Sequence, residues 1–284
     1  MSIRDIKDRI VSVEKTKKIT QAMKMVSAAK FKRHLRALNG LKAYGSGLQH
    51  MGSALARRLY NDDLPELMQP SQAKRSAVIV LSSDRGLCGG FNVSVFKALN
   101  ALMATDESID LFTIGQKSAQ FYAGKSIQCA GSRPGFSITT PLSELTAYME
   151  PFIEGFLRGQ YGHVRIVYNG FVSALSANQV VQSLLPVTLP DWNPNVVSDA
   201  DFIYESSKVS ALNAFCRKMV MQQFMEGLYN SLVSEEGFRM AAMDSASTNA
   251  KEMISELTLF YNRSRQAAIT TELTEIVAGA ASIT

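Results

Sequence analysis

Proline is absent from both ends of the sequence. All eight prolines lie between Pro65 and Pro194, so the first 64 and the last 90 residues contain none. A proline inside a helix costs about 3 kcal/mol, and proline-free ends therefore permit long helices. The distribution predicts a helix at each end of the chain and a mixed middle part.

Cysteine pairs and long apolar runs are also absent. The three cysteines, Cys88, Cys129 and Cys216, are far apart, without a CxxC motif or a histidine cluster beside them, which argues against a zinc site or a disulfide framework. No window reaches the roughly 18 consecutive apolar residues of a membrane span. Acidic residues stand where a signal peptide would be apolar, so we expect the chain to stay where it is made.

Motifs for catalysis are missing as well. The three histidines, His34, His50 and His163, are scattered, and neither GxSxG nor HExxH occurs. The paired acidic residues are typical of loops or solvated faces. We therefore expect no active site, no metal and no cofactor in this chain.

Apolar residues along the first 58 positions follow helical spacing. The steps of three and four shift in phase around Lys17 and Lys18, which predicts an amphipathic helix that does not keep one strict heptad register. At roughly 1.5 Å per residue, a helix from residue 3 to 58 would be about 84 Å long. The positions that carry the pattern are Ile6, Ile10, Val13, Ile19, Met23, Val26, Phe31, Leu35 and Leu38.

The last part of the chain predicts a second, longer helix. Residues 207–277 contain no proline and would span about 106 Å as one helix. A globule of this size has a radius of gyration of about 19 Å, so neither helix fits within it. We expect the two to pair as an antiparallel coiled coil with a weak seam, because residues 241–252 ("AAMDSASTNAKE") are mostly small or polar.

Strand-like runs alternate with helical segments in the middle. The apolar runs 76–82, 109–114 and 164–169, with 182–190 as a weaker candidate, are separated by expected helices near 92–104, 115–123 and 143–158. This alternation predicts a Rossmann-like α/β domain with a mainly parallel sheet. The fold class is therefore α/β, a long antiparallel coiled coil plus this domain. The predicted boundaries are 1–60, 61–205 and 206–284.

A glycine-rich loop, "LSSDRGLCGGFN" (81–92), follows the first predicted strand. Such a loop ahead of a helix can bind phosphate, but the residues that follow lack the lysine and hydroxyl of GxxxxGK[ST], and GxGxxG is absent too. A tight turn is therefore the preferred interpretation, with Asp84 and Arg85 as a charged contact for a partner. A nucleotide-binding enzyme remains the third candidate function.

The N-terminal segment is strongly basic. Residues 1–58 contain 14 Lys and Arg and 3 Asp and Glu, whereas the whole chain has a net charge of +5. Such a helix suits nucleic acid, an anionic membrane surface or an acidic protein. Its charges surround the helix without interleaved aromatics, which disfavours single-strand binding. An acidic protein partner is preferred, and a nucleic-acid-binding coiled coil remains the alternative.

Three segments carry a family resemblance. Residues 3–33 ("IRDIKDRIVSVEKTKKITQAMKMVSAAKFKR"), 82–92 ("SSDRGLCGGFN") and 260–283 ("FYNRSRQAAITTELTEIVAGAASI") resemble the signature segments of F-type ATP synthase γ subunits, in the same order. The resemblance implies a rotor shaft that is not itself an enzyme. It further implies partners in the α and β subunits of the α3β3 ring, the ε subunit and the c-ring, a membrane association only through the c-ring, and no nucleic acid.

The resemblance also implies contact residues. For the α/β ring these are Met23, Lys24, Asp84, Arg85, Cys88, Arg239, Arg265, Gln266, Thr270 and Glu272; for ε and the c-ring they are Phe202, Tyr204 and Glu205. Simple seam packing is the alternative for Met23, and a solvated surface position is the alternative for Arg239.

One family feature is missing. The plastid form of this family has a closely spaced cysteine pair in an extra regulatory segment, and this chain has no such pair. Thiol control of rotation is not expected. Without a transit-like leader, the expected location is the cytoplasmic face of a bacterial inner membrane, as a peripheral subunit.

Overall fold

The structure is a computed structural model that describes residues 2–56, 64–105, 108–125, 127, 129–188 and 208–281. The chain divides into two units, which we describe separately. The first combines residues 1–27 with 239–284, and the second comprises residues 28–238. Two long helices run through both units, α1 (Ile3–Ala56) and α5 (Lys208–Ala281). The expected helices are therefore confirmed: α1 covers Ile3–Ala56 where 3–58 was predicted, and α5 covers Lys208–Ala281 where 207–277 was predicted.

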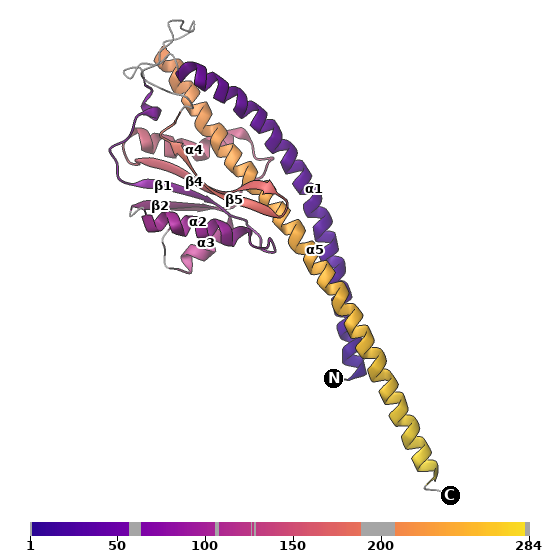
Figure 1. The fold of residues 1–284 in the computed structure, drawn as a ribbon. Coiled ribbons are helices and arrows are strands. Elements are labelled where there is room, and N and C mark those ends of the chain that lie inside the picture. Colours follow the sequence, from indigo (N-terminus) through magenta and orange to yellow (C-terminus); the bar gives the residue numbers. More distant parts are fainter. Residues whose placement is uncertain are drawn as a thin grey trace. The chain divides into compact units, whose positions relative to one another are not determined.

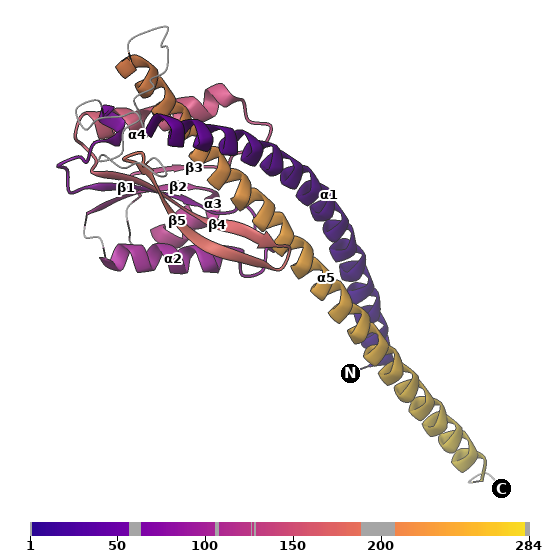
Figure 2. The ribbon, with the colours of Figure 1, turned by 45° about the horizontal axis from the view of Figure 1, so that its top comes forward.

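The second unit contains an α/β domain with a five-stranded sheet (Figures 1 and 2). The strand order is β3-β2-β1-β4-β5, and all neighbours are parallel except β4 and β5. The strands are β1 (Ser76–Leu81), β2 (Ile109–Ile114), β3 (Gly131–Arg133), β4 (His163–Ser173) and β5 (Ser176–Leu185). The predicted parallel-dominated sheet is confirmed.

Two predicted strand assignments need correction. The weak candidate at 182–190 is a strand over Ser176–Leu185, and it forms an antiparallel hairpin with β4. The short strand β3 was not expected at all, because three residues with the sequence GSR carry no alternating apolar pattern. Both differences lie at the two edges of the sheet, where the strands are least apolar.

Helices cover both faces of the sheet. The helices α2 (Phe91–Thr105) and α3 (Gln116–Ala123) pack on one face, whereas α4 (Leu142–Leu157) and α5 lie on the other (Figure 1). The short helix η2 (Glu66–Met68) packs against α4. The core is accordingly split: Val78 and Val80 pack with α2 and α3, and Ile79 packs with α4 and α5. All six residues of β1 are buried, as expected for a central parallel strand.

Helices α1 and α5 are antiparallel within each unit. In the second unit, Lys30 Nζ lies 3.7 Å from Glu236 Oε1, and His34 Nδ1 lies 3.3 Å from the Leu232 carbonyl oxygen. In the first unit, Lys24 Nζ and Asp244 Oδ1 are 2.6 Å apart. As the residue number increases along α1, the number of its contact residue on α5 decreases, which confirms the predicted antiparallel pairing.

The seam of α1 keeps one heptad register, so the predicted phase shift is wrong. Two series with a spacing of seven include every buried residue on α1, and all their members are buried or half-buried. Ile19 and Val26, expected in the seam, are 60% and 57% exposed. One series is Ile6, Val13, Thr20, Ser27, His34, Leu41, Leu48 and Leu55; the other is Ile3, Ile10, Lys17, Lys24, Phe31, Leu38, Gly45 and Gly52.

Polar residues explain the misplaced seam. Thr20, Ser27 and His34 are 9%, 2% and 7% exposed although none is apolar. The Thr20 hydroxyl donates to the Lys17 carbonyl at 3.0 Å, so its burial leaves no unpaired donor. Apolar spacing alone therefore predicts a seam through the neighbouring Ile19 and Val26, which is wrong.

Candidate partner-binding surfaces

The C-terminal part of α5 is an exposed helical surface in the first unit. Both ribbon views show it running past the N-terminus of α1 (Figures 1 and 2). None of residues 251–278 is buried. Four of the predicted ring-contact residues, Arg265, Gln266, Thr270 and Glu272, lie here and are exposed. This stretch also exposes large apolar side chains, including Leu273 at 58% and Ile276 at 67%.

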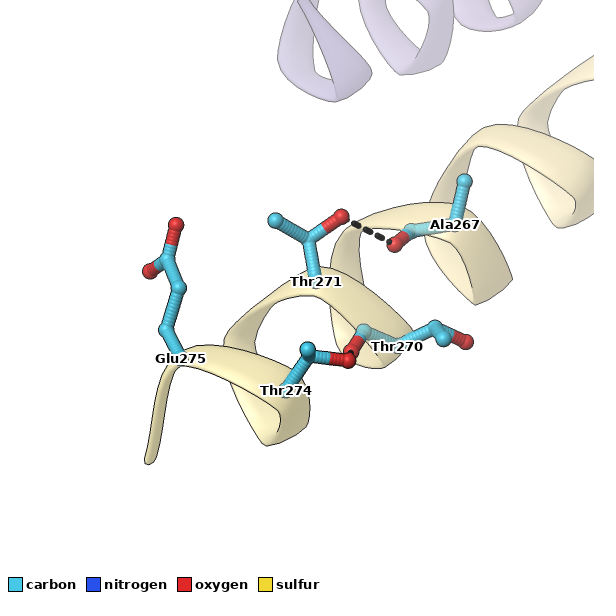
Figure 3. A pocket seen from close by; sticks show the side chains of 5 residues that line it. All are labelled: Ala267, Thr270, Thr271, Thr274 and Glu275. Carbon is cyan, nitrogen blue, oxygen red and sulfur yellow. Dashed lines mark hydrogen bonds between the residues drawn. The ribbon is translucent and has the colours of Figure 1, made fainter. Parts of the chain in front are cut away.

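A shallow hollow on this stretch is lined by Ala267, Thr270, Thr271, Thr274 and Glu275 (Figure 3). Its threonine hydroxyls donate to their own helix: Thr271 to the Ala267 carbonyl at 3.0 Å, and Thr274 to the Thr270 carbonyl at 2.8 Å. Because a single helix bounds the hollow and all five lining residues are exposed, it is a contact surface and not an enclosed ligand site. The predicted contact residues did not include Thr271, Thr274 or Glu275. Threonines at helical spacing in the proline-free C-terminal segment were a signal for this surface.

The remaining shaft candidates are less accessible. Met23 is half-buried, consistent with partial seam packing. The Lys24 side chain is 40% exposed and paired with Asp244, so its charge is already partly compensated. Arg239 is 8% exposed, so its interpretation as a solvated surface residue is wrong, and little of its side chain is within reach of a partner.

The basic surface of α1 extends through both units. Beyond Glu14, no acidic residue occurs on this helix. In the first unit Lys7, Lys15 and Lys18 are exposed, and in the second Lys30, Lys32, Arg33 and Arg36 are exposed. Beyond Glu14 the helix therefore carries basic side chains and no acidic ones, which favours an acidic partner.

The glycine-rich loop is a tight turn between β1 and α2. Leu87 and Gly89 have positive φ angles of 61° and 55°. Asn92, in the first turn of α2, fastens the loop: its Oδ1 accepts the Ser83 backbone N–H at 3.1 Å, and its Nδ2 donates to Ser83 Oγ at 2.8 Å and to Cys88 Sγ at 3.3 Å. Sequence reasoning missed this role of Asn92.

Asp84 binds neighbouring loops instead of projecting freely. Its Oδ1 accepts the Gln116 N–H at 3.0 Å, and its carboxylate accepts the Gly135 N–H at 3.0 and 3.1 Å. The next amides of α3 are also taken, since Lys117 N–H donates to the Ser83 carbonyl and Ser118 N–H to Ser82 Oγ. The first backbone donors of α3 are therefore satisfied from within the domain, by groups of residues 82–84.

The other two loop candidates differ in exposure. Arg85 is exposed, and Leu87 beside it is 63% exposed. Cys88 is 2% exposed and faces inward toward Ser83 and Asn92. The loop thus brings Asp84, Arg85 and Cys88 together, but it is Arg85 that faces solvent.

The three thiols are free cysteines in sheltered positions. Cys216 is fully buried, and this burial raises the pKa of its thiol to about 12. Burial also raises the pKa of the half-buried Cys129. Neutral thiols are weak nucleophiles, so this environment suits a structural role.

The predicted contact residues for ε and the c-ring, Phe202, Tyr204 and Glu205, lie outside the described residues. Within the described ranges, no group of three or more His, Cys, Asp or Glu side chains could hold a metal ion. Among these same residues, no helix has the length and apolar character needed to cross a membrane.

These observations define a class of protein: a doubly wound α/β domain joined to a pair of long antiparallel helices, whose candidate sites are helix surfaces and a rigid loop. A family model described as "ATP synthase" matches residues 2–283. The chain is 40% identical to an ATP synthase gamma chain of Geobacter sp. (strain M21) over 99% of both chains, and 40% identical to that of Geotalea daltonii, again over 99% of both.

Solved structures share the fold. A chain of the Euglena gracilis mitochondrial ATP synthase, in an assembly with OSCP, F1 and the c-ring, aligns with a TM-score of 0.72 at 18% identity, covering 99% of this chain and 94% of that one. A chain of the Tetrahymena thermophila central stalk and c-ring aligns with a TM-score of 0.59 at 23% identity, covering 81% and 99%. The chain belongs to the ATP synthase gamma chain family.

Proposed function

We propose that this chain is the central rotor shaft of an F-type ATP synthase. In this role it couples ion-driven rotation of a c-ring to the conformational cycle of catalytic β subunits, for ATP synthesis or hydrolysis. Family membership over nearly the whole chain carries the proposal, and the fold shared with a central-stalk chain supports it. No comparison favours the nucleic-acid-binding alternative.

The exposed end of α5 is the proposed contact with the α3β3 ring. A helix of this length that exposes Leu273 and Ile276 needs a surrounding surface to cover them. The neighbouring Arg265, Gln266, Thr270 and Glu272 would contact the ring, and the basic face of α1 would meet acidic segments of β. Nucleotide chemistry would occur on β, and this chain would transmit torque.

The remaining contacts follow the same proposal. Met23 and Lys24 would complete the shaft contact, with the largely buried Arg239 supporting it, and Asp84, Arg85 and Cys88 would form or support the contact with β. Phe202, Tyr204 and Glu205 would bind ε and the c-ring. The working domains would be residues 1–60, 61–205 and 206–284, at the cytoplasmic face of a bacterial inner membrane.

Co-purification tests the partners. The tagged chain, expressed with the α and β subunits of its own complex, is expected to recover both in excess over itself. Recovery of the folded chain alone would contradict the proposal. A steeply salt-dependent affinity for DNA under the same conditions would instead favour the nucleic-acid-binding alternative.

A truncation and a matched pair of substitutions test the contact surface. Deletion of residues 260–284 should leave a folded α/β domain but weaken ATP synthesis in reconstituted vesicles. Thr270→Ala should also lower synthesis, whereas Thr146→Ala should not, although Thr146 is likewise an exposed helical threonine that donates to the carbonyl four residues before it. Unchanged synthesis with the truncated chain would refute the proposed contact.

A further inference from the structure

Strand β4 extends beyond its pairing with β1, and helix α5 bonds to the extension. The β1–β4 register ends at Val167, whereas β4 continues to Ser173 with β5 on its other side. Here the Phe171 N–H donates to Asn230 Oδ1 at 3.3 Å, and Ser234 Oγ donates to the Asn169 carbonyl at 3.2 Å. Two side chains of α5 thus bond to backbone groups that a strand neighbour would otherwise pair.

The hydrogen bond from Ser234 to Asn169 is buried, and the one from Phe171 to Asn230 is partly buried. Asn169 and Ser234 are fully buried, and Asn230 is 6% exposed. The Asn230 amide is held in place because its Nδ2 donates to the Glu226 carbonyl at 2.9 Å. Away from water, such bonds are costly to leave unmade, so their geometry is strongly maintained.

Asn169 continues the connection to the opposite face of the sheet. Its Nδ2 donates to the Phe91 carbonyl at 2.8 Å, and its Oδ1 accepts a hydrogen bond from Ser94 Oγ at 3.0 Å. Both partners belong to α2. A chain of buried polar contacts therefore passes from α5 through β4 to α2.

Two glycines allow α5 to lie close to the sheet on either side of these bonds. A Cβ atom at Gly227 would lie 3.1 Å from Ile166 Cδ1 and from Tyr168 Cε1, and one at Gly237 would lie 3.1 Å from the Ala174 carbonyl oxygen. Positions 227, 230, 234 and 237 are spaced by three and four residues, so they share one face of the helix. The face that carries the bonds is also the face of closest approach.

We propose that Asn230 and Ser234 are positioning residues that fix the rotation of α5 about its own axis against the α/β domain. This inference rests on the proposed rotor function, in which torque passes between the domain and α5. Apolar packing resists separation but is non-directional, whereas a hydrogen bond depends on angle. The large apolar contact between α5 and the sheet therefore holds the helix on the sheet. The side chains of Asn230 and Ser234 set the rotation of the helix about its own axis.

The test measures torsional stiffness in the assembled complex. The α3β3 ring is fixed to a surface and the complex is stalled with an inhibitor. A bead is attached to α2 through Lys97→Cys, an exposed position, in a chain that also carries Cys129→Ser. We expect the Asn230→Ala/Ser234→Ala chain to broaden the angular distribution of the bead at least twofold in variance. ATP hydrolysis by the same complex should stay within twofold of the parent.

Two controls separate positioning from general stability. Val78→Ala removes apolar volume from the core on the α2 side, away from α5, and should lower the thermal midpoint without broadening the distribution. Asn39→Ala changes an exposed asparagine on α1; it should not broaden the distribution and, because alanine has the higher helix propensity, should not lower the thermal midpoint. If the double variant fails to assemble, Ser234→Ala alone is measured against Ser234→Thr, which retains the hydroxyl.

The outcomes are distinct. An unchanged angular variance in a folded, assembled variant overturns the inference, as does an equal broadening in Val78→Ala. If the parent chain itself does not assemble with α and β, the proposed rotor function fails before any variant is compared.

Discussion

Three glycines of α1 give a stability prediction that separates helix propensity from packing. Gly40, Gly45 and Gly47 lie within seven residues of one another in the same helix. A Cβ atom at Gly40 or Gly47 would meet no atom within 4 Å, whereas one at Gly45 would lie 2.3 Å from Gln222 Nε2 and 3.0 Å from its Cδ. Alanine at these positions therefore has two opposite consequences.

The magnitudes follow from these surroundings. Glycine in a helix interior is less favourable than alanine by about 0.5–1 kcal/mol, so Gly40→Ala and Gly47→Ala should each stabilise by about that much. Gly45→Ala gains the same propensity, but Gln222 is 4% exposed and donates to Glu226 Oε2 at 2.8 Å, so it must move and disturb that bond. Overpacking costs about 1–3 kcal/mol, which makes this variant neutral or less stable.

Thermal unfolding of the purified chain, followed by circular dichroism at the helix band, is the assay. For a chain of this size, 1 kcal/mol corresponds to a shift of about 2–4 °C in the midpoint. The Gly40→Ala/Gly47→Ala chain should melt a few degrees above the parent, and Gly45→Ala at or below it. Stabilisation by Gly45→Ala equal to that of Gly40→Ala would refute the close contact with Gln222.

Three further predictions concern single side chains. Burial lowers the pKa of His34, so the folded state favours the neutral ring. The free energy of unfolding is therefore highest above about pH 6.5 and falls as the pH drops through the lowered pKa. His34→Gln should flatten this decline in unfolding midpoints measured from about pH 7.5 to 5. A parent and variant with parallel pH profiles would contradict it. Asp84→Ala removes the acceptor of two backbone amides and should increase hydrogen exchange at Gln116 and Gly135, while exchange in α5 stays unchanged as the internal control. Lys24→Ala breaks a pair whose side chains are 40% and 56% exposed, so it should cost at most about 1 kcal/mol, and high salt should reduce the difference from the parent in urea unfolding.

Much of the fold could be predicted because its strongest signals are local. The absence of proline marked both long helices, and the run at 76–82, apolar from Ala77 to Leu81, marked the central strand. The seam of α1 could not be placed in this way, because Thr20, Ser27 and His34 occupy buried positions while Ile19 is exposed. The seam positions do repeat every seven residues, but because some of them are polar, apolar spacing alone does not reveal the register.

The candidate surfaces were predictable in kind but not in detail. The resemblance indicated the C-terminal end of α5 and the loop at 82–92, and the structure places the α5 candidates between Arg265 and Glu272 on an exposed stretch, whereas Arg239 is buried. It did not indicate that Asp84 and Cys88 are committed to contacts inside the domain, because those contacts join segments far apart in the sequence, such as Gly135 with Asp84. The buried connection from α5 through Asn169 was invisible for the same reason.

The sheltered thiols have a practical consequence for single-molecule work. Maleimide dyes react with the thiolate at accessible sites, and Cys88 and Cys216 are 2% and 0% exposed. Cys129 is only half-buried, with a raised pKa. A chain carrying Cys129→Ser and one engineered surface cysteine would therefore accept a single label, and the two native thiols could remain in place as part of the core.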